Sequence, residues 1–294
     1  MICAQNSKIK LTVAKNGAEI KSIKQIENGL EYMWQANPNV WGRTAPVLFP
    51  IVGRLSEDTF LHNGVAYHMS QHGFARDTAF ELVQQSDEIL VFEMKSNDKT
   101  RAMYPFDFIF QIKYELVENE VLVTWRVVND GLEPMYFSIG AHPGFNIHLS
   151  ENDVLTDYYL HFKDSDGVST LLFNQQTGRV YKDKETIIEG LKLLPLSADL
   201  FAEYGALIID GETEITLASY EHDHEVKVSF EGFPLVGIWT AVNEKGVAGE
   251  FVCIEPWFGH GDDVEAPQEL KDKKGIQTLE SSQVFEATYR MMFK

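Results

Sequence analysis

The most constraining feature of the sequence is a strict two-residue alternation between positions 106 and 127. Large side chains take every second position of its first half, namely Phe106, Phe108, Phe110, Ile112, Tyr114 and Leu116. After Glu118 and Asn119 the alternation resumes with Val121, Val123, Trp125 and Val127. Because successive side chains of a β-strand point to opposite faces of a sheet, the pattern predicts two half-buried strands joined by a tight turn.

Shorter segments of the same kind recur along the chain, separated by turn signals such as Asn16-Gly17 and Asp210-Gly211. Strands are expected at residues 9–13, 20–26, 88–94, 215–219, 226–230, 235–240 and 251–255. Helical patterns are scarce, with residues 153–160 and 265–270 as the candidates. Without a linker-like stretch or an internal repeat, we expect one all-β domain over residues 1–294, an antiparallel sandwich or barrel.

Composition excludes several classes of partner. The chain carries 44 acidic and 25 basic residues, for a formal charge of −19, which repels nucleic-acid phosphates and anionic membrane surfaces. Cys3 and Cys253 fit neither a disulfide framework nor a zinc knuckle. The sequence has no signal-peptide pattern and no apolar run of about 18 residues, so a cytoplasmic location is expected.

The absence of two familiar sequence motifs argues against two further kinds of chemistry. The chain contains neither GxxxxGK[ST] nor GxSxG, which argues against a phosphate-cradling loop and a serine-hydrolase elbow. Possible metal ligands occur at His222, Asp223 and His224 and at His260, Asp262 and Asp263. Histidines two apart on a strand face the same side, but no third ligand has a telling spacing. We therefore expect no metal site.

Residues 41–54, WGRTAPVLFPIVGR, place two arginines around an apolar run with Pro46 and Pro50. Prolines exclude this segment from the interior of a central strand. Two interpretations remain open. The segment is either a buried crossover loop with surface arginines, or a rigid loop that presents Arg43 or Arg54 to sugar hydroxyls, a carboxylate or a phosphate.

Three further segments combine titratable side chains with small or aromatic residues. They contain His72 and Arg76 in residues 71–76, His142 in residues 140–146, and Glu255 with Trp257 in residues 253–257. A glutamate in apolar surroundings is costly, so Glu255 is either a functional carboxylate or the ion-pair partner of an arginine. A histidine acid and a buried glutamate base would form an acid/base pair for a polyol substrate, with no organic cofactor.

Four ordered motifs resemble the aldose 1-epimerase (galactose mutarotase-like) superfamily, most closely its LacX-type branch and the neighbouring hexose-6-phosphate 1-epimerases. The motifs are RTAPVLFPIVGRL at 43–55, QHGFAR at 71–76, GAHPGFN at 140–146 and CIEPWFG at 253–259. The resemblance covers essentially the whole chain. It implies a large antiparallel β-sandwich with an open sugar-binding face.

The resemblance also implies roles for single residues. The family's catalytic acid falls on His142 and its catalytic base on Glu255. Its second sugar-contacting histidine falls on His72, the arginine of its GR[IL] element on Arg54, and a substrate-binding aspartate late in its sequence on Asp199. The motifs themselves add Arg43, Arg76, Trp257 and Phe145 as expected substrate-binding residues.

The expected function is that of an aldose 1-epimerase, an isomerase that exchanges the α and β anomers of a hexose by ring opening. The expected protein is a monomer or homodimer that needs neither metal nor cofactor. A hexose 6-phosphate is the alternative substrate, because Arg43, Arg54 and Arg76 would suit a dianion if they converge. If they form structural ion pairs instead, a neutral aldose is favoured. A non-catalytic carbohydrate-binding or sensor protein is the alternative from another class.

Overall fold

The computed structural model describes residues 1–164, 168–188 and 192–294. The alternating segment forms a hairpin of strands β8 (Phe108–Val117) and β9 (Glu120–Asn129), in which Ile112 lies opposite Trp125. Buried and partly exposed side chains alternate along both strands. The predicted hairpin is therefore confirmed, although its first strand begins at Phe108 rather than at Phe106.

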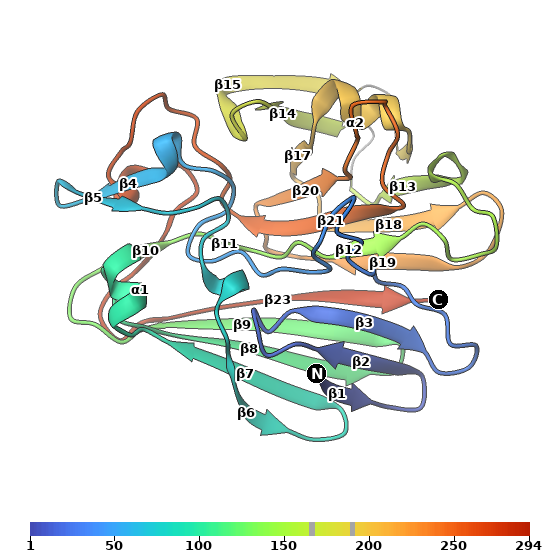
Figure 1. The fold of residues 1–294 in the computed structure, drawn as a ribbon, viewed down its shortest axis with the longest axis horizontal. Helices are drawn as coiled ribbons and strands as arrows, with labels where there is room; N and C mark the ends of the chain where they lie inside the picture. Colours follow the sequence, from blue (N-terminus) through green and yellow to red (C-terminus); the bar gives the residue numbers. More distant parts are fainter. Residues whose placement is uncertain (165–167, 189–191) are drawn as a thin grey trace.

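The hairpin belongs to a nine-stranded antiparallel sheet, one of two large sheets in the structure (Figure 1). Its order is β16 (Leu193–Pro195), β13 (Tyr158–Phe162), β18 (Glu214–Ser219), β19 (Glu225–Ser229), β23 (Val284–Phe293), β9, β8, β7 (Ile89–Lys95) and β6 (Glu81–Gln85).

The second large sheet is antiparallel and seven-stranded, and it carries the candidate site. Its path is β11 (Ile139–Gly140), β21 (Phe251–Phe258), β20 (Leu235–Trp239), β17 (Leu207–Asp210), β14 (Val168–Asn174) and β15 (Arg179–Ile188). Strand β12 (Gly144–Asn146) also pairs with β21.

Smaller elements complete the fold. Three short sheets are formed by β1 (Ile2–Gln5), β2 (Ile9–Val13) and β3 (Ile20–Gln25), by β4 (Thr59–His62) and β5 (Val65–His68), and by β10 (Met135–Phe137) and β22 (Gln277–Leu279). The α-helices are α1 (Asp98–Met103) and α2 (Ala198–Tyr204), and the 3₁₀ turns are η1 (Ser56–Asp58), η2 (Ala75–Asp77), η3 (Leu155–Asp157) and η4 (Leu270–Asp272). No helix in the described ranges has the length and apolar character needed to cross a membrane.

Each of the seven segments predicted as strands contains one, so the all-β sandwich is confirmed. Both helix predictions are wrong. Residues 153–160 form the turn η3 followed by the start of β13, and residues 265–270 only reach the first residue of η4. The side chains of Tyr158, Leu160 and Phe162 are buried alternately along β13. A short apolar segment of this kind does not distinguish helix from strand by its periodicity.

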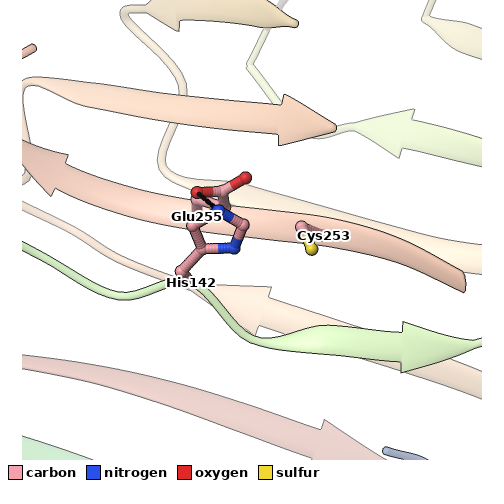
Figure 2. A group of neighbouring side chains, drawn as sticks. All are labelled: His142, Cys253 and Glu255. Carbon is pink, nitrogen blue, oxygen red and sulfur yellow. Dashed lines mark ion pairs between the residues drawn. The ribbon is translucent and has the colours of Figure 1, made fainter. Parts of the chain in front are cut away.

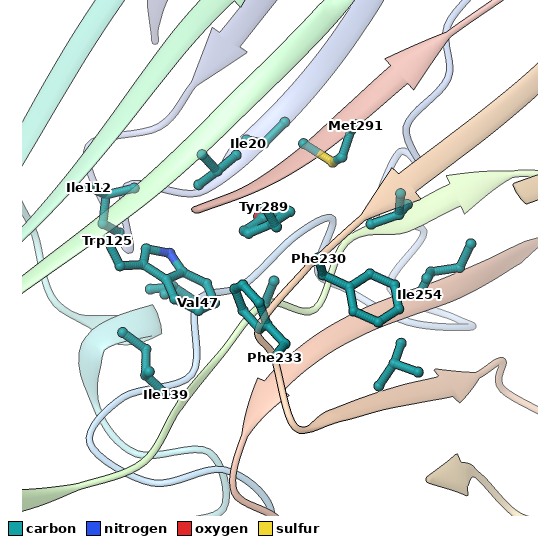
Figure 3. Packing of buried hydrophobic residues seen from close by; sticks show 14 of the residues in the cluster. Ile20, Val47, Ile112, Trp125, Ile139, Phe230, Phe233, Ile254, Tyr289 and Met291 are labelled. Atoms are coloured by element: carbon teal, nitrogen blue, oxygen red, sulfur yellow. The ribbon is translucent and has the colours of Figure 1, made fainter. Parts of the chain in front are cut away.

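A hydrophobic core joins the two large sheets. Trp125 and Tyr289 of the nine-stranded sheet belong to the same buried cluster as Ile254 of β21, and Phe233 bridges them from the loop before β20 (Figure 3). On β21, Val252 and Ile254 enter this core. Because side chains alternate along a strand, Cys253, Glu255 and Trp257 face the opposite side of the sheet, where the site lies.

Candidate active site

Glu255 lies in the middle of β21, on the face that points away from the main core. Cys253 and Trp257 share this face, and every residue of the strand except its last is buried. Hydrophobic and aromatic side chains cluster on this face, and Glu255 is only 1% exposed. The carboxyl group therefore lies in an apolar environment, as expected from the sequence.

His142 lies between β11 and β12, which both pair with β21. The Ala141 N–H donates to the Pro256 carbonyl at 3.0 Å, and the Ile254 N–H donates to the Pro143 carbonyl at 3.4 Å. These bonds fix the peptide on either side of His142 against the strand of Glu255. Figure 2 shows the imidazole directed at the carboxylate.

The two side chains meet with His142 Nε2 lying 3.2 Å from Glu255 Oε2. Within the described residues, His142 Nδ1 and Glu255 Oε2 have no partner with hydrogen-bond geometry, although both atoms are buried. Buried polar atoms normally have partners, and exceptions cluster at functional positions. The acid/base pair is therefore an exception of this kind, with one unpartnered polar atom on each side chain.

Burial controls the charge of this pair. It raises the pKa of Glu255 well above its usual value. It also lowers the pKa of His142 to about 3, with the positive charges of Arg76 and Arg43 adding to the effect. Both pKa shifts favour the neutral form of each side chain when no substrate is bound.

Aromatic rings enclose His142 on two sides. Trp41 stacks on the imidazole with ring centroids 4.9 Å apart, and Trp239 meets it edge-on at 5.6 Å. Trp41 and Trp239 also contact each other. These rings exclude water from the imidazole, which explains why burial is the largest contribution to its lowered pKa.

Trp257 forms the floor of the site, and two glycines make room for its ring. A Cβ atom on Gly140 would lie 2.5 Å from Trp257 Cδ1, and one on Gly237 would lie 2.5 Å from Trp257 Cη2. The indole nitrogen donates to the Ala141 carbonyl at 3.1 Å. The ring is therefore held flat across the strands next to Glu255.

His72 is placed beside His142 by an unusual backbone conformation. Its φ angle is +66°, a region that non-glycine residues rarely adopt. The His72 N–H donates to the Gly53 carbonyl at 2.9 Å, and the Gly53 N–H donates back to His72 Nδ1 at 3.1 Å. The two imidazole rings then lie 5.6 Å apart in a T-shaped arrangement.

A cavity of about 270 Å³ opens above these residues. Its polar side chains are Gln71, His72, Arg76, His142 and Glu255, and its other lining residues are Trp41, Pro46, Gly53, Phe173, Gly178, Val180, Ala206, Ile208, Trp239, Trp257 and Gly261. The structure therefore brings together four of the residues expected from the sequence as catalytic or binding groups, His72, Arg76, His142 and Glu255, with Trp257 below them.

Arg76 is the arginine that reaches the cavity. Its Nη2 donates to the Gln71 carbonyl at 2.6 Å, whereas its buried Nε has no hydrogen-bond partner in the described structure. Burial lowers the pKa of Arg76 to about 10, so the guanidinium remains charged at neutral pH.

Other expected binding residues lie outside the cavity lining. Arg43 pairs with Asp77 at 2.8 Å, and Arg54 forms a two-pronged pair with Asp58 at 2.8 Å for both contacts. Asp199 is exposed in the first turn of α2. Phe145 is fully buried in the hydrophobic core. Arg43 and Arg54 therefore form ion pairs instead of converging on the cavity with Arg76.

Several lining residues were not identified from the sequence as binding groups. Trp41 and Gln71 lie within segments that the sequence marked, but Trp239, Phe173, Val180, Ala206 and Ile208 belong to ordinary apolar stretches. Period-two alternation could have placed Trp239 on the face of Glu255, because Trp239 lies opposite Cys253 and Gly237 lies opposite Glu255. Nothing in the local pattern distinguishes the other four from core residues.

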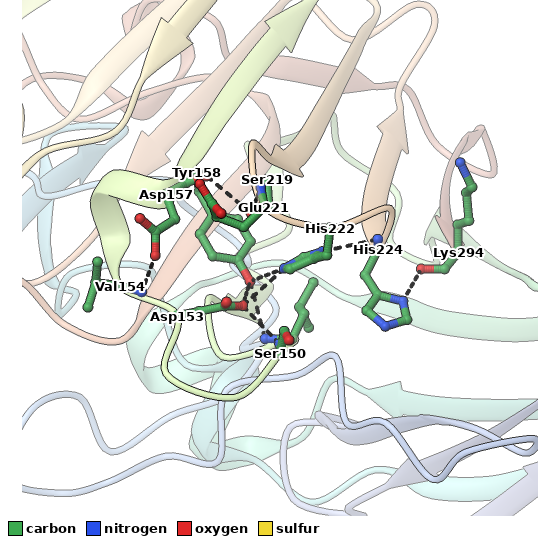
Figure 4. A network of polar contacts seen from close by, with 11 residues as sticks. Ser150, Asp153, Val154, Asp157, Tyr158, Ser219, Glu221, His222, His224 and Lys294 are labelled. Atoms are coloured by element: carbon green, nitrogen blue, oxygen red, sulfur yellow. Dashed lines mark hydrogen bonds and ion pairs between the residues drawn. The ribbon is translucent and has the colours of Figure 1, made fainter.

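The histidines considered as metal ligands have other partners. His222 Nε2 lies 3.0 Å from Asp153 Oδ2, which also accepts hydrogen bonds from Tyr158 Oη and the Ser150 N–H (Figure 4). The His224 N–H occupies the second His222 nitrogen, at 3.1 Å. This network connects the loop before β13 to the turn between β18 and β19.

At the second candidate, Asp262 forms a buried ion pair with Lys273 at 3.1 Å, and His260 Nδ1 contacts the Gly261 carbonyl at 2.6 Å. Among described residues, the one group placed closely enough to share a metal ion is His142, Cys253 and Glu255, whose potential ligand atoms lie within 4.8 Å of one another. The Cys253 thiol is fully buried, and burial raises its pKa, which disfavours the thiolate that a metal requires.

Solved structures with the same architecture define the class of protein. The galactose mutarotase related enzyme from Lactobacillus acidophilus has a TM-score of 0.94 at 35% identity, over 100% of this chain and 97% of that chain. A galactose mutarotase-like protein from Lactobacillus casei has a TM-score of 0.90 at 29% identity, over 100% of both chains. The fold is thus that of the galactose mutarotase-like proteins.

Sequence comparisons then give the family. The aldose 1-epimerase family model matches residues 1–275. The plasmid-encoded protein LacX of Lactococcus lactis subsp. lactis is 31% identical over 269 residues, which cover 88% of each protein. The chain belongs to the aldose 1-epimerase family, and this membership supports a sugar epimerase or mutarotase function.

Proposed function

We propose that this chain exchanges the anomers of an unphosphorylated aldose, with Glu255 as the base and His142 as the acid. The 3.2 Å approach of His142 Nε2 to Glu255 Oε2 at the base of the cavity carries this proposal. Two proton-transfer groups side by side can serve the anomeric hydroxyl and the ring oxygen, because both oxygens are bonded to C1 of an aldose.

The proton balance follows from the resting charge of the pair. Transfer of the carboxyl proton of Glu255 to His142 produces the carboxylate and the imidazolium. Glu255 then accepts the proton of the anomeric hydroxyl while His142 donates one to the ring oxygen, so that the C1–O5 bond breaks and a free aldehyde forms. Rotation about C1–C2 and the reverse transfers close the ring as the other anomer. The pair ends with the single proton it started with.

The arginines support a neutral substrate over a sugar phosphate. A phosphate dianion is best held by several guanidinium groups with free paired donors. Here Arg43 and Arg54 are engaged with Asp77 and Asp58, and Arg76 is the one that lines the cavity. The apolar residues opposite the acid/base pair offer no compensating positive charge.

The decisive experiment measures anomer exchange by NMR on free hexoses and on hexose 6-phosphates, using the intact chain and Glu255→Gln. We expect exchange of free aldoses, with a loss of about 10²–10⁴-fold in the variant. Exchange confined to the phosphates would replace the substrate assignment. Full activity of Glu255→Gln would overturn the catalytic assignment. Binding of sugars without any exchange would show a carbohydrate-binding protein.

A further inference from the structure

One wall of the cavity is apolar throughout. It consists of Phe173, Val180, Ala206 and Ile208. Val180, Ile208 and Trp257 belong to one buried hydrophobic cluster, with Phe173 packed against it. None of these four side chains can donate or accept a hydrogen bond.

The backbone donors of this wall already have partners. The Val180 N–H donates to the Asp262 carbonyl at 3.0 Å, and the Ala206 N–H to the Tyr204 carbonyl at 2.9 Å. The Ile208 N–H donates to Thr170 Oγ1 at 2.8 Å. A sugar hydroxyl pressed against this wall would meet hydrocarbon side chains, and these three N–H groups would not be free to donate to it.

Strand register places the wall at the end of the cavity away from His142. Glu255 lies opposite Gly237, and Gly237 lies opposite Ile208, so Ile208 is two strands from Glu255, a separation of about 9–10 Å. His142 lies on the other side of β21, between β11 and β12. The cavity therefore runs from His142 across Glu255 to Ile208.

The inference rests on the proposed function, in which a pyranose ring reacts at His142 and Glu255. The order of His142, Glu255 and Ile208 along the cavity then suggests how the ring would lie. With the ring oxygen at His142 and the anomeric hydroxyl at Glu255, the ring edge formed by C2 and C3 points away from His142. For a ring that lies along the line from His142 across Glu255 to Ile208, that edge faces Ile208 and its neighbours. We propose that the preferred substrate is a deoxyaldose that lacks a hydroxyl at C2 or C3, and that Val180, Ala206 and Ile208 determine this specificity.

The size of the preference follows from the chemistry of the wall. A site built to bind a hydroxyl rejects the deoxy analogue by about 10⁴–10⁵-fold, whereas an apolar pocket disfavours an added hydroxyl by at most about 10²-fold. The intact chain should therefore act on 2-deoxy- or 3-deoxyglucose with a kcat/KM about 10–100-fold above that for glucose.

The test compares glucose, 2-deoxyglucose and 3-deoxyglucose by NMR anomer exchange and measures the Kd of each by calorimetry. Val180→Thr and Ala206→Ser add hydroxyls with little change in volume, and we expect either to reduce the preference. Val247→Thr is the matched control, because Val247 is 59% exposed and lies outside the cavity lining. Val247→Thr should prefer the deoxy sugars over glucose as strongly as the unmodified chain does.

The outcomes separate the inference from the proposed function. Faster exchange and tighter binding of glucose than of both deoxy sugars would overturn the inference. If no sugar is exchanged, the proposed function fails, and the Kd values still decide the inference: tighter binding of a deoxy sugar supports it, and equal or weaker binding contradicts it.

Discussion

The indole of Trp41 stacks on the imidazole of His142, with ring centroids 4.9 Å apart and planes inclined by 27°. The same indole lines the cavity and covers one face of the imidazole. Trp41 comes from a segment far from His142 in sequence. Their contact therefore depends on the tertiary fold and provides a direct test of how burial controls the pair.

Replacing Trp41 with alanine should raise the pKa of His142 from about 3 toward the ordinary value of 6.5, because water would then solvate the imidazolium. NMR titration of the imidazole measures this change. Trp41→Phe keeps an aromatic ring and should shift the pKa less. An unchanged pKa in Trp41→Ala would show that Trp41 does not control the burial of His142.

His142→Asn should make the protein less sensitive to acid. The unfolded chain binds a proton at this histidine below about pH 6.5, while the folded chain excludes it until about pH 3, so the free energy of unfolding falls as the pH drops through this window. Removing the imidazole should reduce the slope of the free energy of unfolding against pH by up to about 1.4 kcal/mol per pH unit. Denaturant unfolding at several pH values measures the slope, and an equal slope in both proteins would contradict the prediction.

Glu255→Gln should be more stable than the unmodified chain at neutral pH. Burial raises the pKa of this carboxyl, so the folded state holds a proton that the unfolded state releases above about pH 4.5. Stability is therefore lost as the pH rises from 4.5 through the raised pKa, and the amide has no such loss. Thermal unfolding at pH 5 and pH 8 checks the sign, since the advantage of the variant must grow with pH.

Gly237→Ala should disturb the floor of the site. Its new Cβ would lie 2.5 Å from Trp257 Cη2, which forces the ring to move and costs about 1–3 kcal/mol of stability. The rate of anomer exchange should fall as well, because Trp257 lies beside Glu255. Gly42→Ala is the control, since the nearest atom to its Cβ would be 3.8 Å away. Unaltered exchange and stability in Gly237→Ala would show that the floor adapts without cost.

Tyr158→Phe should affect stability alone. The lost hydroxyl donates to Asp153 and accepts from the Leu149 N–H, so we expect a loss of about 1–3 kcal/mol. Tyr158 lies outside the cavity lining, so anomer exchange by the folded variant should be unchanged. A reduced exchange rate at temperatures where the variant is fully folded would indicate that this network acts on the site.

Local patterns in the sequence were sufficient for much of the fold. Alternation predicted the hairpin of β8 and β9 because the geometry of a strand fixes which side chains share a face. The prediction of a helix at residues 153–160 was wrong, because a turn and the start of a strand there resemble a short acidic helix. Helices this small are decided by capping and packing more than by periodicity.

By itself, the sequence determined the chemical groups of the site and their local settings: a histidine held in a short segment, and a glutamate within an apolar strand. Only the tertiary structure decided which of these groups lie next to one another. It brought His142 to Glu255, engaged Arg43 and Arg54 in ion pairs, and set Ile208 at the far end of the cavity. The physical reason is that alternation fixes a face for each side chain, whereas the pairing of distant strands fixes which faces meet.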